Sequence, residues 1–323
     1  MTKPRAAVLV YNPEAGRIRS NRRLVGKLAA ALRVHVRDVE AVATEGPRTA
    51  ARTVREWIGR GAELVCVAGG DGTVNEAAEG LAGTGVPLLV LPAGTANVLS
   101  CEIGTGNNAL RTAARLGEME PASIAPGVLR NAEGERLFLC MAGAGLDARI
   151  VRQVSPAWKR RLGKLSYWEG GLAQLGRRLE VFEAEVDGRR FECSFALMAR
   201  VRNYGGDLWI ARHANLLEDR LAVVLFKGAS SLRYLKYFAG VLLNRLRGMR
   251  GVEVLDAESV RIRPLEDPLI DVQVDGEHAG FAPAEAGLGR ERIVLLVPER
   301  YAARMRARAG AQGTGAAENL RRA

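Results

Sequence analysis

Short apolar runs and longer segments of mixed polarity alternate over roughly the first 120 residues. Runs such as 6–11 are apolar throughout, which is typical of parallel strands buried on both faces. The segments between them place apolar residues at helical spacing, for example Ala50, Val54 and Trp57. This alternation predicts a doubly wound parallel sheet covered by helices. The expected strands are 6–11, 34–42, 63–68 and 86–91, and the expected helices are 20–32, 47–60 and 75–81.

Short strand-like runs dominate after about residue 122. Asp187-Gly188 and Asp275-Gly276 each separate two such runs, and Asp-Gly is a strong signal for a two-residue hairpin turn. Two helical segments interrupt the runs, near 158–175 and 232–247. The expected strands are 124–129, 136–141, 179–186, 190–201, 221–226, 259–264, 269–274 and 291–297.

These patterns predict an α/β protein of two domains with a cleft between them. Residues 1–121 would form the parallel-sheet domain, with 298–308 as a candidate addition to it. Residues 122–297 would form a mainly antiparallel β-sandwich domain. The tail 309–323 has no apolar period, and we expect it to lack regular structure.

The net charge of +11 and the isoelectric point near 10.0 restrict the partners more than the fold. Nucleotides, nucleic acid and anionic membranes all attract such a chain. No nucleic-acid-binding motif accompanies the charge, so nucleic acid is not an expected partner. No apolar stretch reaches the ~18 residues that span a bilayer. The cysteines lie far apart, without a Cys-x-x-Cys pair, as is typical of buried thiols in a reducing compartment: Cys66, Cys101, Cys140 and Cys193.

Three polar loops that contain glycine directly follow expected strands, at 11–16, 69–76 and 91–97. The carboxyl ends of parallel strands meet at one sheet edge, where open α/β folds bind ligands. Glycines let a backbone approach phosphate oxygens, and the amides of a helix N-terminus point at the anion. The loop 69–76 is neither a Walker A loop nor a Gly-x-Gly-x-x-Gly fingerprint. Its glycines alone would suit an unliganded turn equally well, but the polar residues beside them favour a phosphate site.

The order of five motifs resembles the diacylglycerol kinase catalytic family, which includes bacterial lipid kinases and sphingosine kinases. The resemblance continues to about residue 298. NAD kinases and phosphofructokinase-like enzymes share the Gly-Gly-Asp-Gly-Thr core, whereas the Val-Asn-Glu after it favours the lipid kinases. The motifs are Tyr11-Asn12-Pro13 with Gly16, Gly69 to Glu76, Leu91 to Asn97, Asn203-Tyr204-Gly205-Gly206, and Asp275-Gly276-Glu277.

The resemblance implies that the first domain binds ATP and that the chain phosphorylates a hydroxyl of a lipid such as diacylglycerol or a sphingoid base. Asn12 would order the loop 69–76, which we call the phosphate loop. Asp71 would join a metal and water network near the phosphates. Thr44 and Thr95 would be further nucleotide contacts, although Thr44 also fits an ordinary capping residue. Glu76 in a first helical turn is favourable for the helix dipole alone. The implied nucleotide-binding residues are Asn12, Thr44, Gly69, Gly70, Asp71, Gly72, Thr73, Val74, Asn75, Glu76, Gly94 and Thr95.

Phosphoryl transfer to a hydroxyl needs a carboxylate that accepts the proton. From the sequence alone, Asp275-Gly276-Glu277 is better explained as a plain hairpin, but in the resembled family this segment carries the catalytic base. We expect Glu277 to be the proton acceptor, with Asp275 as the alternative. Their i, i+2 spacing allows both to face one side and does not separate them.

The resemblance also implies a structural Mg²⁺ site, in addition to the Mg²⁺ carried by ATP. Asp219 would bind through its carboxylate, and Leu216 and Leu221 through carbonyl oxygens, the ligand type that Mg²⁺ prefers. Arg220 stands where the family usually has glycine. An arginine is unfavourable if the turn needs a positive φ, and its charge opposes a nearby cation.

Two basic stretches with aromatic residues, 158–168 and 232–238, suit contact with an anionic membrane surface. Amphipathic helices packed on the second domain would explain them equally well. We therefore expect a cytoplasmic protein that contacts the membrane peripherally. The sequence does not show which lipid is phosphorylated or the oligomeric state.

Two other functions remain open from the residues. An NAD kinase-like soluble phosphotransferase shares the glycine-rich core but fits the 275–277 segment and the basic aromatic stretches less well. A non-catalytic regulator that binds a nucleotide or lipid is supported mainly by the departure at Arg220.

Overall fold

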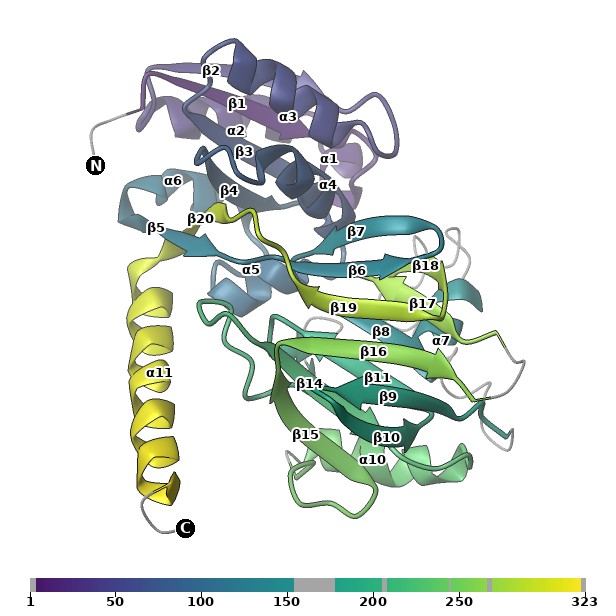
Figure 1. Ribbon diagram of the computed structural model, residues 1–323. Coiled ribbons are helices and arrows are strands. Elements are labelled where there is room, and N and C mark those ends of the chain that lie inside the picture. Colours follow the sequence, from purple (N-terminus) through teal and green to yellow (C-terminus); the bar gives the residue numbers. More distant parts are fainter. Residues whose placement is uncertain (1–3, 154–177, 205–207, 244, 266–268, 321–323) are drawn as a thin grey trace.

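The structure is a computed structural model that describes residues 4–153, 178–204, 208–243, 245–265 and 269–320. The chain forms two adjacent domains, and the long helix α11 (Glu299–Leu320) lies beside the second domain (Figure 1). This two-domain α/β architecture confirms the predicted fold class.

The first domain contains a six-stranded sheet with the order β2-β1-β3-β4-β20-β5. All pairs are parallel except that of β20 with β5. The doubly wound sheet that the alternation predicted is therefore present. The strands are β1 (Ala6–Tyr11), β2 (Asp38–Ala43), β3 (Leu64–Gly69), β4 (Pro87–Pro92), β5 (Met119–Ile124) and β20 (Ile293–Pro298).

Helices cover both faces of this sheet, which explains why its strands are apolar throughout. Along β3, Leu64 and Cys66 pack into the core under α2 and α6, whereas Val65 and Val67 pack into the core under α3 and α4. Each face thus has its own apolar layer. The helices are α1 (Gly16–Ser20), α2 (Arg23–Arg33), α3 (Ala50–Gly59), α4 (Asp71–Leu81), α5 (Val98–Ile103) and α6 (Ala109–Ala114), with a 3₁₀ turn at Leu116–Glu118.

The second domain is built from two six-stranded sheets with antiparallel neighbours, ordered β10-β9-β16-β19-β6-β7 and β15-β14-β11-β8-β17-β18. An apolar core that draws on both sheets fills the space between them. The elements are β6 (Gly127–Asn131), β7 (Gly134–Phe138), β8 (Met141–Gly145), α7 (Leu146–Gln153), β9 (Phe182–Val186), β10 (Arg189–Cys193), β11 (Phe195–Ala199), β12 (Asn203–Tyr204), β13 (Leu208–Trp209), β14 (Leu221–Phe226), α10 (Leu232–Leu242), β15 (Val252–Ala257), β16 (Ser259–Pro264), β17 (Asp271–Val274), β18 (Glu277–Phe281) and β19 (Ala284–Leu288).

Both Asp-Gly pairs form the two-residue hairpin turns that the sequence predicted. Asp187 and Gly188 have φ values of 44° and 81°, and Asp275 and Gly276 have 47° and 80°. Positive φ at both central positions is the requirement of a type I′ turn, which aspartate and glycine meet most readily.

Three expected elements differ from the structure. The single strand expected at 190–201 is two strands, β10 and β11, which belong to different sheets. The strand expected at 291–297 in the second domain is β20, and it lies in the first sheet between β4 and β5. The tail expected to lack structure continues α11 to Leu320. This helix starts on buried residues, Tyr301, Ala302 and Met305, so its nucleus is already formed and extension needs no apolar period. The helix expected near 158–175 lies outside the described residues.

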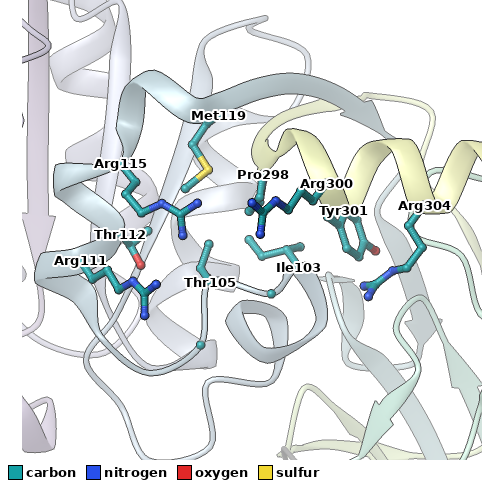
Figure 2. Close-up of a pocket in the computed structure, with 12 residues that line it drawn as sticks. Ile103, Thr105, Arg111, Thr112, Arg115, Met119, Pro298, Arg300, Tyr301 and Arg304 are labelled. Atoms are coloured by element: carbon teal, nitrogen blue, oxygen red, sulfur yellow. The ribbon is translucent and has the colours of Figure 1, made fainter.

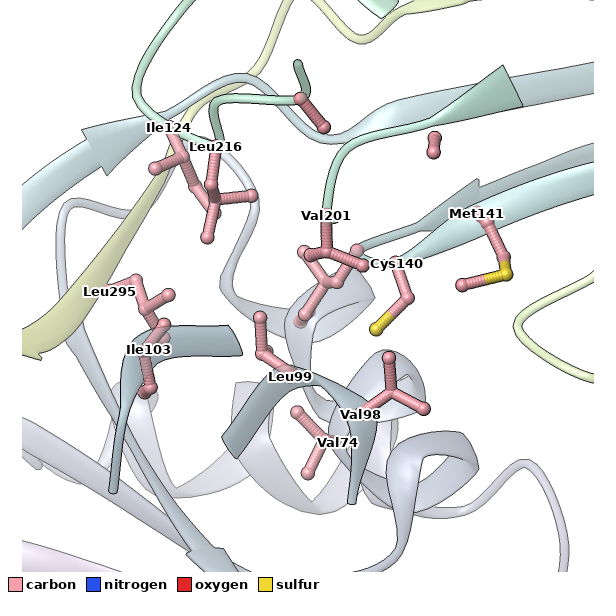
Figure 3. Packing of buried hydrophobic residues seen from close by; sticks show 14 of the residues in the cluster. Val74, Val98, Leu99, Ile103, Ile124, Cys140, Met141, Val201, Leu216 and Leu295 are labelled. Carbon is pink, nitrogen blue, oxygen red and sulfur yellow. The ribbon is translucent and has the colours of Figure 1, made fainter. Parts of the chain in front are cut away.

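A single apolar cluster joins the two domains where the chain crosses between them (Figure 3). Val74 and Leu99 from the first domain belong to the same buried cluster as Cys140, Val201 and Leu216 from the second. Close-packed interiors deform little. The shared core therefore fixes how residues of the second domain face the loops of the first.

Candidate active site

The loops after β3 and β4 are in backbone contact at the carboxyl edge of the first sheet. The N–H groups of Ala93 and Gly94 donate to the Gly69 carbonyl at 2.9 and 3.1 Å. A Cβ added to Gly94 would lie 2.5 Å from the Gly70 Cα. Only glycine permits this approach. Two of the three predicted loops thus form one surface.

Glycine is also required at the turn from β3 into α4. A Cβ added to Gly69 would lie 2.6 Å from the Thr73 Cβ. Gly70 is the N-cap residue of α4, so the N–H groups of the following turn have no partner within the helix. These amides and the helix dipole suit the phosphates of a nucleotide, and the residues present fit that ligand.

Asn12 ties the loop after β1 to the same turn. Its Nδ2 donates to the Thr73 Oγ1 at 3.1 Å, and its Oδ1 accepts the Glu14 N–H at 2.9 Å. Its own N–H donates to the Ala68 carbonyl at the end of β3. Asn12 therefore holds Thr73 in place, in keeping with an ordering role.

The loop after β4 is closed by Asn97, which adopts a left-handed φ of 47°. Its side chain accepts the Gly94 N–H and donates to the Gly94 carbonyl, both at 2.9 Å. This closure leaves Thr95 exposed at the loop tip, where it is free to meet a ligand. Asn97 was not among the predicted site residues, although its αL-tolerant side chain after Gly-Thr-Ala was the available signal.

The Asp71 carboxyl group contacts the start of α5. Its Oδ1 accepts the Leu99 N–H at 3.3 Å. Burial raises the pKa of Asp71, and the backbone amides of Val98 and Leu99 partly oppose that shift. In this structure the carboxyl group joins the phosphate loop to α5.

Asn75 and Glu76 connect α4 to its neighbours. The Asn75 Nδ2 donates to the Leu137 carbonyl at 2.7 Å, across the domain boundary, while its buried Oδ1 has no partner. Glu76 accepts the N–H groups of Arg48 and Ala50 at 2.9 and 3.3 Å, which caps the start of α3. This cap also holds the loop that follows Thr44, a buried residue whose N–H donates to the Tyr11 carbonyl.

Asp275 is enclosed by backbone amides. Its two oxygens accept the N–H groups of Leu139, Cys140 and Met141 at 2.7 to 3.0 Å. Burial raises the pKa of Asp275 to about 7 in spite of these donors. All this bonding is directed at the segment between β7 and β8, so Asp275 anchors the hairpin.

Glu277 stands over the phosphate loop with an open carboxylate. A Cβ added to Gly72 would lie 3.0 Å from its Oε1, and its side chain is 56% exposed. The Arg136 Nη2 donates to the Glu277 Oε2 at 3.0 Å. Arg136, a partner that the sequence reasoning missed, also donates to the His278 carbonyl at 3.2 Å. The tertiary structure thus brings Glu277 against a loop some two hundred residues earlier in the chain.

A buried network of polar side chains binds the Asp275-Gly276 hairpin. Gln273 accepts the Gly276 N–H at 2.8 Å and donates to the Asp147 Oδ2 at 2.7 Å. Tyr204 donates to the other oxygen of Asp147, and burial raises the pKa of that carboxyl group. Asn203 and Tyr204 belong to a motif of the sequence analysis, and Gly205 and Gly206 lie outside the described residues.

The residues predicted to hold a structural Mg²⁺ do not fit the ion in this structure. Both oxygens of Asp219 accept hydrogen bonds from Arg292, at 2.8 and 3.1 Å, and the Leu216 carbonyl accepts one from Arg200 at 2.8 Å. Leu221 begins β14 and pairs with Ala257. Guanidinium groups already bind the Asp219 and Leu216 oxygens, and their charge opposes a divalent ion. Nowhere in the described ranges do three or more His, Cys, Asp or Glu side chains form a metal-binding group.

A pocket of about 380 Å³ lies away from these loops, between the C-terminal end of α5, α6 and the start of α11 (Figure 2). Arg111 and Arg115 line one side and Arg300 and Arg304 the other. No residue of the three motif loops lines it. This cationic pocket is therefore separate from the candidate active site.

Two family descriptions match the chain in order. Residues 6–126 match the diacylglycerol kinase catalytic domain. Residues 140–297 match the YegS C-terminal NAD kinase beta sandwich-like domain. The two matches correspond to the two domains of the structure.

Curated relatives and solved structures agree with these matches. The chain is 28% identical to a diacylglycerol kinase of Mycobacterium tuberculosis over 75% of this chain and 79% of the relative. It is 32% identical to a Cronobacter sakazakii protein named probable lipid kinase YegS-like, over 72% of this chain and 78% of the relative. A crystal structure of a diacylglycerol kinase from Bacillus anthracis has the same fold, with a TM-score of 0.70 and 23% identity over 93% of this chain and 99% of that one.

Proposed function

Because the chain belongs to the YegS-like lipid kinases, which carry the diacylglycerol kinase catalytic domain, it is a lipid kinase, and we propose that it transfers the γ-phosphoryl group of ATP to a lipid hydroxyl. The names of the relatives favour diacylglycerol as the acceptor, with a sphingoid base as the second candidate. The observation that carries the proposal is the Glu277 carboxylate, which stands against Gly72 at the start of α4.

The phosphates would lie along the N-terminal turn of α4, from Gly70 to Thr73, with Thr95 of the neighbouring loop beside them. Thr44 at the end of β2 would meet the nucleoside end. Mg²⁺ bound together with ATP would neutralise charge on the phosphates. Most of the catalytic effect in such a reaction comes from positioning and charge stabilisation.

Glu277 would accept the proton of the lipid hydroxyl as its oxygen bonds to the γ-phosphorus. The bond from that phosphorus to the bridging oxygen breaks, and ADP leaves. Arg136 holds one oxygen of Glu277, which directs the other towards Gly72. Asp275 would act as a positioning residue, because its oxygens are bound to backbone amides.

Access to a lipid would come through peripheral membrane contact by α10. Leu232, Leu235, Leu242 and Leu243 are exposed on or just after this helix. Arginines and a lysine, but no acidic residues, accompany them between 231 and 251. Exposed apolar residues among cations are typical of helices that lie on anionic bilayers. The stretch 158–168 lies outside the described residues, and no helix in the part of the chain that the structure describes is long and apolar enough to cross a membrane.

The test is transfer of label from γ-labelled ATP to diacylglycerol, sphingosine and NAD, each offered to the full chain. Label in the lipid extract is expected. Glu277→Gln should lower kcat about 10²- to 10⁴-fold, as loss of a general base does, with little change in Tm. Glu285→Gln, which alters an exposed carboxylate on β19, is the control and should leave kcat unchanged.

Each alternative has its own outcome in the same assay. Label found in NADP and in no lipid would indicate an NAD kinase-like phosphotransferase. Nucleotide binding without transfer to any acceptor would indicate a regulator. Full turnover by Glu277→Gln would contradict its role as the base.

A further inference from the structure

Arg200 lies in the interior at the junction of the two domains, just after β11. It is 1% exposed and is the largest fully buried side chain among the described residues. Its Nε donates to the Ala125 carbonyl at 3.1 Å, its Nη2 to the Leu216 carbonyl at 2.8 Å, and its Nη1 to the Arg220 carbonyl. A buried charge requires such compensation, because its hydration is lost.

These carbonyls come from segments that the guanidinium holds together. Ala125 lies on the crossover from the first domain to the second, directly after β5. Leu216 and Arg220 bracket the turn before β14, where the sequence predicted a structural Mg²⁺ site. A ring of carbonyl oxygens around a central positive charge is the arrangement expected for a hard cation. Here the positive charge is a side chain.

At the same turn, the side chains of Asp219 and Arg220 pair with residues outside the turn. Asp219, whose side chain is 54% exposed, pairs through both of its oxygens with Arg292. Arg220 has no positive φ, so the turn does not require the glycine that the family usually carries. The Arg220 side chain points outward to Glu258 at 3.2 Å. An arginine at position 220 is therefore compatible with the backbone of this turn.

We propose that the Arg200 guanidinium is a built-in cation that takes the place of a divalent metal ion at this turn, so that the fold needs no ion there. A guanidinium group keeps its positive charge at neutral pH in proteins, so Arg200 supplies a permanent cation. The inference stands without the proposed function, since it concerns what stabilises the folded chain.

The position of Arg200 also connects it to the candidate site. Its backbone N–H donates to the Cys140 carbonyl at 2.8 Å, and the Cys140 N–H donates to the Asp275 carboxylate. The backbone of the strand end that carries Arg200 is thus joined to the segment that anchors the Asp275 hairpin. Arg202, two residues later, pairs with the buried Glu102 at 2.9 Å and ties the same strand end to α5.

The first test is thermal unfolding without nucleotide, in EDTA and in millimolar Mg²⁺, for the wild type and Asp219→Asn. The proposal predicts that Mg²⁺ shifts the Tm of either protein by less than about 1 °C, because only a ligand of the native state raises it. A rise of about 3 °C or more in the wild type that Asp219→Asn abolishes would overturn the proposal.

The second test replaces the cation. Arg200→Ala should lower the Tm by about 5 °C or more, because three carbonyls, two of them in buried contacts, lose their donors. Millimolar methylguanidinium should restore part of that loss. Arg263→Ala, which removes a half-exposed arginine from β16, is the control and should shift by less than about 1 °C with no response to methylguanidinium.

Arg200→Lys keeps the charge but not the fork of donors, so its Tm should fall between those of the wild type and Arg200→Ala. A Tm of Arg200→Ala equal to that of the wild type would overturn the proposal, as would recovery in Mg²⁺ equal to that in methylguanidinium. If Arg200→Ala does not fold, the Mg²⁺ response of the wild type and of Arg200→Lys decides the question in the same terms.

Discussion

At the scale of single residues, Asp275 and Glu277 lie two positions apart in one hairpin but have different surroundings. Asp275 is enclosed by three amides, and Glu277 holds an open carboxylate against the phosphate loop. A proton acceptor must be able to reach its substrate, and a carboxylate saturated by backbone donors is suited to holding structure. The two environments therefore favour the proposed assignment, with Glu277 as the proton acceptor and Asp275 as the positioning residue, which the i, i+2 spacing left open.

Gly72→Ala tests the contact between Glu277 and the phosphate loop. Because the new Cβ would lie 3.0 Å from Oε1, Glu277 has to move, and we expect kcat to fall at least about tenfold. Alanine also favours the helix, so the free energy of unfolding should stay equal or rise. Gly59→Ala in α3 meets no atom within 4 Å and is the control, expected to raise stability by about 0.5 kcal/mol with normal kcat. Unchanged kcat for Gly72→Ala would count against the placement of Glu277.

The buried carboxyl group of Asp275 predicts a pH dependence of stability. Its pKa rises from 3.8 to about 7 on folding, so the native state binds more protons than the unfolded state between these values. Its contribution to stability is therefore complete below about pH 4 and is lost as the pH rises to about 7.

Urea unfolding at several pH values measures the pH dependence of stability for the wild type and for Asp275→Asn, whose side chain at position 275 does not titrate. The difference in free energy of unfolding, wild type minus variant, should decrease between about pH 4 and pH 7. A difference that increases over that window would mean that the amide donors hold the pKa low.

At the scale of elements, α4 connects neighbouring segments of the chain in addition to its proposed role in phosphate binding. Three residues of its first turns form hydrogen bonds to other segments: Thr73 to Asn12, Asn75 to β7 and Glu76 to the start of α3. The residues of the motif Gly-Gly-Asp-Gly-Thr-Val-Asn-Glu therefore contact several neighbouring segments of the chain. Some residues that the resemblance assigned to nucleotide binding have a structural partner in addition.

The helix α10 carries the prediction about membranes. Leu235→Glu should lower the fraction of protein retained by vesicles with anionic lipid at least about threefold at low salt, because it places a negative charge among exposed leucines and cations. Leu269→Glu, which changes an even more exposed leucine elsewhere in the second domain, is the control and should be retained as the wild type is. Equal retention of the wild type by neutral vesicles at high salt would contradict the proposed contact.

At the scale of the whole molecule, a strand near the C-terminus completes the sheet of the first domain. β20 returns from the second domain to lie between β4 and β5, and α11 follows it. The cluster that includes Val74, Leu99, Cys140 and Leu216 then joins the domains into one packed body. The relative position of Glu277 and Gly72 depends on this closure.

A fragment of residues 1–126 should therefore fail to fold by itself. Without β20, strand β4 has a free edge inside the sheet and β5 has no partner, so buried backbone groups would be unpaired. We expect no cooperative thermal transition for the fragment and a single transition for the full chain, measured by circular dichroism. A fragment that unfolds cooperatively at the Tm of the full chain would contradict the shared core.

Local patterns in the sequence determined the class of fold, the alternation of the first sheet, both Asp-Gly hairpins and the glycine-rich loops, because each depends on neighbouring residues and their φ preferences. The tertiary structure decided which sheet receives 293–298, which carboxylate faces the phosphate loop and what lies at the predicted metal site. Arg200 and Arg136 carry no local signal, since the carbonyls and the carboxylate that they bind lie far from them in the sequence. Long-range contacts of this kind depend on how the domains pack, and no periodicity or motif encodes them.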